Sequence, residues 1–321
     1  PSTPTKTPLP YTVNTVITVN RHDPPAPFRL YYSTLSYPHG EIENETKLSW
    51  CLTHAPKSGV THEDEALTFR IARELRTGHE VGAQIVLTDS GHVAKIYDPL
   101  YYNFYGNEEW RFKEDVVTQA DSEYSMEAAA YQELSGSEVE GSVTPRYYGS
   151  WTMTFSRQKD SRDGQSEVRG RTREVRMVLL EYVEGTTMSR MNPKLISQKA
   201  RDNIIVKIIE AETDISFCGV RHDYLYPSNI IICGSDTDLE SPALRICYVD
   251  FAISDIGRIH YGECAEEQYR NPLFTSLLDA DIWRTWGWLT TVDEKETESW
   301  MWRQWGHSEK YAKVKNVDGE P

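Results

Sequence analysis

The chain has 321 residues and a formal net charge of −15 at pH 7, with 49 Asp and Glu residues against 34 Lys and Arg residues. This acidic balance repels phosphate backbones and anionic membrane surfaces, so we expect neither nucleic acid nor a membrane as a partner. The 39% of hydrophobic residues, with nine tryptophans, exclude a disordered acidic segment and suit one large domain or two packed lobes.

The cysteines and the apolar segments indicate a compartment. Five cysteines are widely spaced and form no CxxC pair, which is typical of reduced thiols. No apolar stretch reaches the roughly 18 residues that cross a bilayer. The Pro- and Thr-rich start also lacks the charged-then-apolar plan of a signal peptide. We therefore expect a cytoplasmic or nuclear protein.

The N-terminal part is predicted to begin with an arm over residues 1–60, partly extended or disordered, because its start is rich in proline and threonine. Apolar residues at helix-like spacing predict a helix over residues 63–76. Residues 80–87 and 92–97 alternate apolar and polar side chains around a turn, which predicts a β-hairpin.

Residues 124–134 carry an apolar stripe at helical spacing, and residues 145–155 and 174–182 are predicted strands. The order strand, strand, helix, strand, strand favours a small antiparallel sheet that carries one helix. This part of the chain is the first candidate lobe.

In the second half, isoleucines recur along a long amphipathic helix that is predicted to begin after Asn192 and to end near Gly219. Residues 229–233 and 244–249 are short β-rich runs predicted to pair as a hairpin. The tail from Asn271 is predicted to be helical and holds six of the nine tryptophans, which we expect to pack in a core.

The strongest local signal is the run VRHDYLYPSN, from Val220 to Asn229, which follows the long helix and precedes the short hairpin. It resembles the catalytic loop HRDLxxxN of the protein-kinase-like superfamily. Asp250, in the sequence VDFA, lies 21 residues after Asn229, where that family keeps its metal-binding aspartate. The resemblance implies that Asn229 and Asp250 bind Mg²⁺ on the phosphates of ATP.

Two upstream segments extend the resemblance. Lys95, in the sequence VAK, is similar to the strand lysine that contacts the α- and β-phosphates, and Glu127 is similar to the helix glutamate that positions that lysine. The resemblance gives both residues catalytic roles. Glu123 and Glu133 are alternative partners for the lysine.

The nucleotide contacts that the resemblance implies also include a loop and a hinge. Gly82 belongs to a glycine-containing loop, GHEVGAQ, that would cover the phosphates. Glu181 and Val183 fall where the hinge of the family offers backbone groups to an adenine ring.

The implied fold is α+β: a two-lobed protein-kinase-like fold with a small antiparallel-sheet N-lobe over residues 61–183 and a mainly helical, short C-lobe over residues 184–321. ATP and Mg²⁺ would bind in the cleft between the lobes. The sequence around Lys95 and Glu127 is similar to that of divergent fungal kinase-like proteins.

The sequence departs from the family pattern at the catalytic base. Tyr224 stands at the position of the catalytic aspartate, and a phenol with a pKa of about 10 is a poor base at neutral pH. Asp223 is the candidate base if the loop bulges by one residue. Glu80 lies in the phosphate-covering loop, and Ala252 replaces the glycine that follows the metal aspartate and phenylalanine.

These departures predict a protein that binds ATP and Mg²⁺ with degraded catalytic motifs, as a pseudokinase or a weak atypical phosphotransferase. The alternative is an active ATP-dependent phosphotransferase that acts on a hydroxyl of a small molecule or of a protein. A nucleotide and an unidentified small-molecule or protein partner are the expected ligands.

Overall fold

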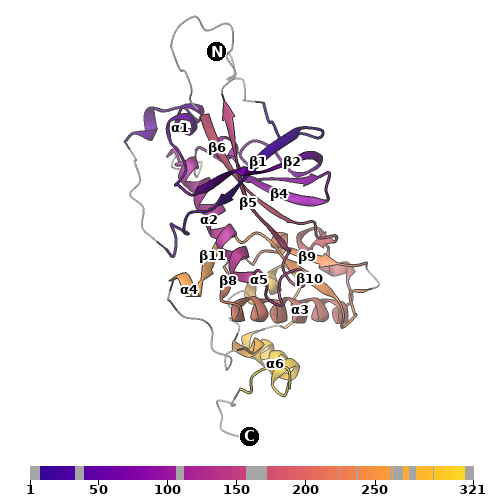
Figure 1. Cartoon of the computed structure of the whole chain (residues 1–321). Helices are drawn as coiled ribbons and strands as arrows, with labels where there is room; N and C mark the ends of the chain where they lie inside the picture. The colour runs from indigo at the N-terminus through magenta and orange to yellow at the C-terminus, as the bar shows by residue number, and fades with distance from the viewer. Residues whose placement is uncertain are drawn as a thin grey trace, which may run out of the picture. The chain divides into compact units, whose positions relative to one another are not determined.

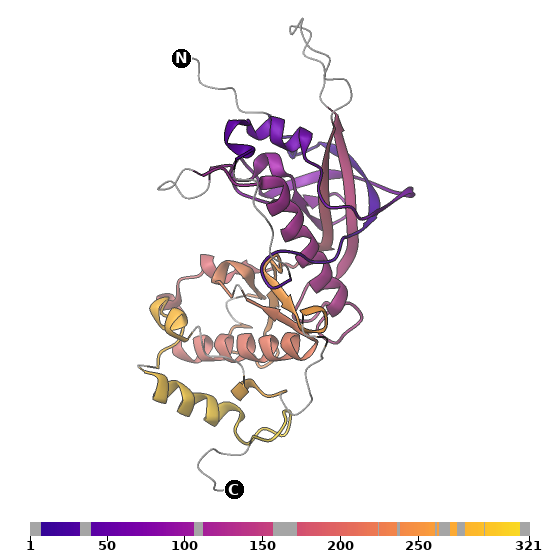
Figure 2. The ribbon, with the colours of Figure 1, turned by 90° about the vertical axis from the view of Figure 1, so that its left-hand side faces the viewer.

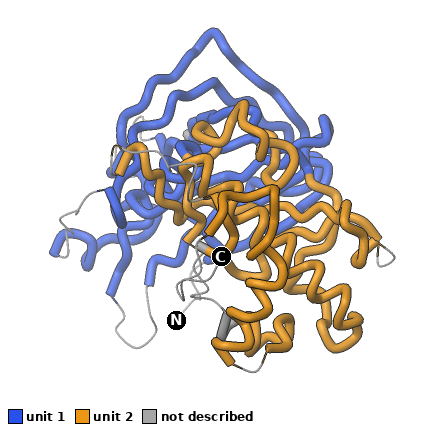
Figure 3. The backbone as a smooth tube through the Cα atoms, turned by 90° about the horizontal axis from the view of Figure 1, so that it is seen from below, with its two compact units in different colours: residues 1–129, 147–182 blue, residues 130–146, 183–321 orange. Residues whose placement is uncertain are grey.

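A computed structural model of the chain describes residues 8–32, 40–105, 112–156, 172–223, 225–235, 238–260, 262, 270–274, 280–291 and 293–314. The chain divides into two compact units (Figure 3): residues 1–129 with 147–182, and residues 130–146 with 183–321.

Six antiparallel strands of the first unit close into a barrel in the order β1, β2, β3, β4, β6, β5 (Figure 1). Their bounds are β1 Val16–Asp23, β2 Val60–Arg76, β3 Gln84–Thr88, β4 His92–Tyr97, β5 Tyr147–Ser156 and β6 Thr172–Glu181. Closure comes from the pairing of β1 with β5, in which Asn20 lies opposite Thr152 and Arg21 lies opposite Trp151.

Strand register separates the two faces of this sheet, because directly opposed residues share a face. Pairs such as Ile17 with Phe69 and Val86 with Ala94 place buried apolar side chains on one face, the inside of the barrel. Its other members are Val19, Ile71, Ile96, Val175, Met177 and Leu179.

Helix α2 (Val116–Leu134) covers the other face of the sheet through residues that belong to the first unit. Tyr124 contributes a hydroxyl that lies 2.6 Å from His22 Nδ1 of β1, and its ring packs on Tyr97 of β4 with centroids 5.7 Å apart. A shorter helix, α1 (Lys47–Thr53), begins where the Thr46 side chain accepts a hydrogen bond from Ser49 N.

The second unit combines helices with two small sheets (Figure 2). Helix α3 (Gln198–Phe217) begins at Ser197, whose side chain accepts from Ala200 N, and it buries an isoleucine stripe. The strands are β7 Thr186–Thr187, β8 Val220–His222, β9 Ile230–Cys233, β10 Arg245–Tyr248 and β11 Ser254–Ile256. The shorter helices are α4 Gly257–His260, α5 Ala280–Thr285 and α6 Glu294–Trp305.

The prediction of a two-lobed protein-kinase-like fold is wrong. The chain is α+β and its sheets are antiparallel, but the sheet of the first unit closes into a six-stranded barrel. In the second unit the described residues form five strands, in sheets of order β10-β9-β7 and β11-β8, in addition to the helices.

The closed barrel arises because two segments form strands that the sequence pattern did not indicate. The predicted helix over residues 63–76 is wrong: β2 spans Val60–Arg76, and Phe69 and Ile71 are buried while their neighbours are exposed. Ala66 and Ala72 completed the helix-like spacing, yet both are exposed. Strand β1 comes from the predicted arm, of which residues 1–7 and 33–39 lie outside the described residues.

In the part of the chain that the structure describes, no helix has the length and apolar character required to cross a lipid bilayer.

A buried polar cluster connects α2 to β6 within the first unit. Asp121 accepts a hydrogen bond of 2.7 Å from Lys57 N, and its other oxygen lies 3.8 Å from Arg176 Nε, too far for a hydrogen bond. Burial raises the pKa of Asp121 to about 6, although Lys57 N and Arg176 oppose this. Burial and the charge of Arg176 lower the pKa of His22 to about 4.

These two pKa shifts have opposite effects on stability between pH 4 and pH 6. Folded Asp121 holds a proton that the unfolded chain has lost, so its contribution to the free energy of unfolding falls as pH rises. Folded His22 lacks a proton that the unfolded chain keeps, so its contribution rises with pH.

We expect Asp121→Asn to make the free energy of unfolding rise more steeply from pH 4 to pH 6, by up to about 1.4 kcal/mol per pH unit, because the His22 contribution is then unopposed. Urea denaturation across this range measures it. A second variant, Asp121→Asn with His22→Gln, should flatten the profile again. Equal slopes in the wild type and in Asp121→Asn would contradict this explanation.

Candidate functional site

Lys95 lies on β4, opposite Ile85 of β3 and Val178 of β6, on the face that α2 covers. Its side chain is 6% exposed and forms an ion pair with Glu127 of α2, whose side chain is 0% exposed. Tyr97, two residues further along the same strand and so on the same face, donates its hydroxyl to the same Glu127 oxygen. The structure therefore brings Lys95 and Glu127 together and adds a tyrosine.

This triad fixes the position of the ammonium group. The charged Lys95 also lies 5.6 Å from the centre of the Tyr97 ring, and both partners restrict the same flexible side chain. Taking both charges out of water is costly, and apolar residues of similar volume are often as stable. A buried pair of this kind is therefore better explained by the placement of a charge than by stability.

The alternative partners that the sequence offered are engaged elsewhere. Glu123 accepts hydrogen bonds from the Tyr102 hydroxyl at 2.8 Å and from the Gln119 side chain at 3.1 Å. Glu133, in the part of α2 that belongs to the second unit, pairs with Arg258 at 2.6 Å. The lysine partner is thus Glu127.

The glycine-containing loop is organised by one side chain that the sequence did not single out. Gln84, fully buried at the start of β3, accepts from Gly78 N at 2.8 Å and donates to Gly82 O at 2.8 Å. Gly82 has φ +76° and Glu80 has φ +63°, a region that glycine enters freely and glutamate enters at a cost. The Gln84 side chain therefore holds the loop in this shape.

Residues of the second unit that carry the remaining motifs lie close together. His222 is buried, its ring lies 4.7 Å from that of Phe251, and its Nε2 donates to Val249 O at 3.1 Å. Val249 N in turn donates to Asn229 O at 2.9 Å. Burial lowers the pKa of His222, so its neutral ring orders the loop rather than carrying charge.

Asp250 has a strained backbone, with φ +69°. Such a conformation costs a non-glycine residue free energy and concentrates at ligand-binding sites. On one side Val249 is bonded to Asn229, and on the other Phe251 is fully buried, so the neighbours on both sides hold the conformation. This makes Asp250 the strongest metal-ligand candidate in the second unit.

The donor chemistry of these residues suits magnesium bound with phosphate. No group of three or more His, Cys, Asp or Glu side chains is placed to hold a metal ion within the described ranges. Asn229 and Asp250 offer a carboxamide and a carboxylate oxygen, and Mg²⁺ commonly takes one or two protein oxygens and fills its shell with phosphates and waters. The bond from Val249 N to Asn229 O brings the backbones of these two segments together.

The candidate base is held by an arginine. Asp223 accepts hydrogen bonds from Arg221 Nε at 2.6 Å and Arg221 Nη2 at 3.3 Å. Its side chain is 19% exposed. Tyr224, which the resemblance aligns with a catalytic aspartate, lies outside the described residues.

The two predicted hinge residues belong to different units. Glu181 ends β6 in the first unit, opposite His92 of β4, and Val183 is buried in the second unit.

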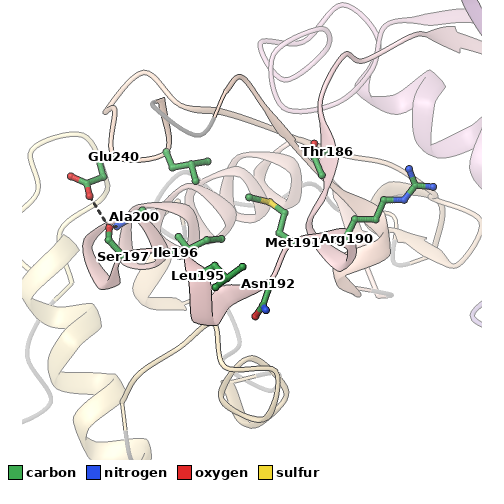
Figure 4. Close-up of a pocket in the computed structure, with 10 residues that line it drawn as sticks. Thr186, Arg190, Met191, Asn192, Leu195, Ile196, Ser197, Ala200 and Glu240 are labelled. Atoms are coloured by element: carbon green, nitrogen blue, oxygen red, sulfur yellow. Dashed lines mark hydrogen bonds between the residues drawn. The ribbon is translucent and has the colours of Figure 1, made fainter.

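The second unit also contains a cavity of about 700 Å³ beside the start of α3 (Figure 4). Met191, Ile196 and Leu239 line it, and at its edge Ser197 donates a hydrogen bond of 2.7 Å to Glu240. None of the predicted site residues lines this cavity.

Sequence reasoning missed Tyr97, Gln84 and Arg221. Tyr97 could have been found from its position two residues after Lys95 on a strand, which places both on one face. Gln84 follows Gly82 at the start of a strand, but a glutamine gives no general signal for loop binding. Arg221 lies in the run VRHDYLYPSN just before His222, and its residue type alone gives no signal that it binds Asp223.

The chain matches no known family model, and no curated protein matches it. Its function therefore rests on the chemistry of the residues themselves.

The Lys95–Glu127 pair makes a prediction for stability. Lys95→Met leaves Glu127 buried without its cation and should lower the free energy of unfolding by about 3–5 kcal/mol. The double variant Lys95→Met with Glu127→Gln removes both charges and keeps an acceptor for Tyr97, so most of the loss should be recovered. Guanidinium denaturation of the wild type, Lys95→Met, Glu127→Gln and the double variant gives the coupling energy, and purely additive losses would rule out the pair as a coupled unit.

Proposed function

We propose that the protein binds ATP with magnesium. In this proposal Lys95 contacts the phosphates, while Asn229 and Asp250 supply oxygen ligands for the metal. The observation that carries the proposal is the buried Lys95–Glu127 ion pair, because it holds a cation in one place at a cost that stability alone does not explain.

Each residue has a separable role. The Lys95 ammonium neutralises phosphate charge, and Glu127 with Tyr97 keeps it from turning away. Gln84 keeps the glycine-containing loop in shape through its bonds to Gly78 and Gly82, which supports backbone contacts to phosphate oxygens. Magnesium, when bound, neutralises the charge of the terminal phosphates.

We propose that phosphate transfer is slow or absent, as in a pseudokinase or a weak atypical phosphotransferase. Tyr224 replaces the aspartate that would accept the proton of the attacking hydroxyl. The second candidate function is active transfer to a hydroxyl of a small molecule or of a protein. Asp223, a partly exposed carboxylate in the same loop as Asn229, favours it.

The relationship to divergent fungal kinase-like proteins is likewise a proposal, supported by the residues around Lys95 and Glu127, while the spacing of Asn229 and Asp250 supports the wider kinase-like resemblance. We also propose a cytosolic or nuclear location and a small-molecule or protein partner besides the nucleotide. Four cysteines of the described residues are thiols outside any disulfide, which is usual in a reducing compartment. Cys264 lies outside the described residues.

A thermal-shift titration with ATP and Mg²⁺ tests the binding. The wild type should gain about 2.7 kcal/mol of stability at a hundredfold excess over Kd, seen as a rise in Tm of several degrees. Lys95→Met with Glu127→Gln should gain nothing. The matched control, Arg176→Met with Asp121→Asn, removes the other buried pair between α2 and the same sheet face and should keep the gain.

Two results would refute the proposal. One is a wild type that shows no shift with ATP and Mg²⁺. The other is an equal shift in the Lys95 double variant and in the control.

A further inference from the structure

Arg221 is placed by strand pairing within the second unit. It lies on β8 directly opposite Asp255 of β11, and its Nη2 is 3.4 Å from Asp255 Oδ2. Asp255 is buried, with a side chain 3% exposed, and its other oxygen lies 3.0 Å from His260 Nδ1. A buried carboxylate thus anchors the guanidinium through Nη2.

The same guanidinium also holds Asp223. Nε and Nη2 each contact a different oxygen of that carboxylate, at 2.6 Å and 3.3 Å, which is the two-point geometry in which arginine binds carboxylates most strongly. Asp255, Arg221 and Asp223 therefore form a row of alternating charges that ends on the candidate base.

This arrangement opposes the action of Asp223 as a base. A base must take a proton on one of its oxygens, and here each oxygen already accepts a hydrogen bond from a group that stays charged. A proton on a remaining lone pair of Asp223 would weaken both charge-assisted bonds and would neutralise the carboxylate beside an arginine whose charge it now balances.

We propose that Arg221 is a restraining residue that withholds Asp223 from proton transfer and so keeps the protein a nucleotide binder with little turnover. The consequence for turnover rests on the proposed function, whereas the restraint on the carboxylate does not. Asp255 positions Arg221.

The reaction that the restraint would suppress is hydrolysis of ATP. Asp223 takes a proton from water while the water oxygen forms a bond to the γ-phosphorus. The bond from the γ-phosphorus to the bridging oxygen breaks, and ADP leaves with its electron pair, so that the products are ADP, phosphate and a protonated Asp223.

The first test needs no nucleotide. A water-soluble carbodiimide with an amine couples to carboxylates that take up a proton, and peptide mass spectrometry measures the labelling of Asp223 against exposed Glu298. Arg221→Met should raise the labelling of Asp223 about tenfold, because a charge-assisted bond is lost, and Arg221→Lys should raise it less.

The matched control is Arg258→Met. Arg258 forms a two-point pair with Glu133 on the same unit, and its side chain is 58% exposed against 54% for Arg221. This variant should leave the labelling of Asp223 unchanged. Equal labelling of Asp223 in the wild type and in Arg221→Met would overturn the restraint.

The second test is turnover of ATP with Mg²⁺. Arg221→Met should hydrolyse ATP about tenfold faster than the wild type, and adding Asp223→Asn should remove the gain. Increased labelling with unchanged turnover, in a protein that still shows the ATP-dependent thermal shift, would overturn the inhibitory role and leave the nucleotide proposal standing. A wild type that shows no thermal shift with ATP and Mg²⁺ would instead overturn nucleotide binding, and it would also overturn the proposed effect of Arg221 on turnover.

Discussion

The first unit depends on how one helix carries carboxylates into a buried interface. Asp121 and Glu127 of α2 are 2% and 0% exposed, and each faces a cation from the sheet, Arg176 or Lys95. The two ion pairs differ in how closely their charged groups approach. Glu127 makes close contacts with Lys95 and Tyr97, whereas Asp121 lies 3.8 Å from Arg176 Nε and has a raised pKa. A cation held in one position, such as Lys95, can bind a ligand, whereas a buried pair with a long separation, such as Arg176 with Asp121, mainly lowers stability.

In the second unit, hydrogen bonds to the backbone hold the candidate metal-binding residues in place. His222 is bonded to Val249, and Val249 is bonded to Asn229, so that residues far apart in the sequence occupy one loop cluster. Asp250 then adopts a left-handed backbone that its fixed neighbours impose. Because metal ligands require oxygens in set positions, ordering the backbone first lowers the entropy lost on binding. Arg221 adds a restraint on Asp223 that the motif alone does not suggest.

The sequence predicted correctly two hairpins and one helix whose signals lie within single short segments of the chain. The hairpin of β3 and β4 and that of β9 and β10 are confirmed, the first from alternating runs around a turn and the second from two short β-rich runs. The isoleucine stripe also predicted α3. The barrel was not predictable, because β1 and β2 are separated by 36 residues and close the sheet through pairs between distant strands. At the site, the pairing of Lys95 with Glu127 followed from the motif, but the contacts of Tyr97 and Arg221 required the structure.

The most direct measurement of the central claim is a crystal structure of the protein with a non-hydrolysable ATP analogue and Mg²⁺. We expect a phosphate oxygen within hydrogen-bond distance of Lys95 Nζ while Lys95 keeps its contact with Glu127, and we expect Asp250 to bind the metal. A nucleotide bound away from Lys95, with the ammonium contacting only Glu127 and Tyr97, would contradict the claim that this buried pair exists to hold phosphate.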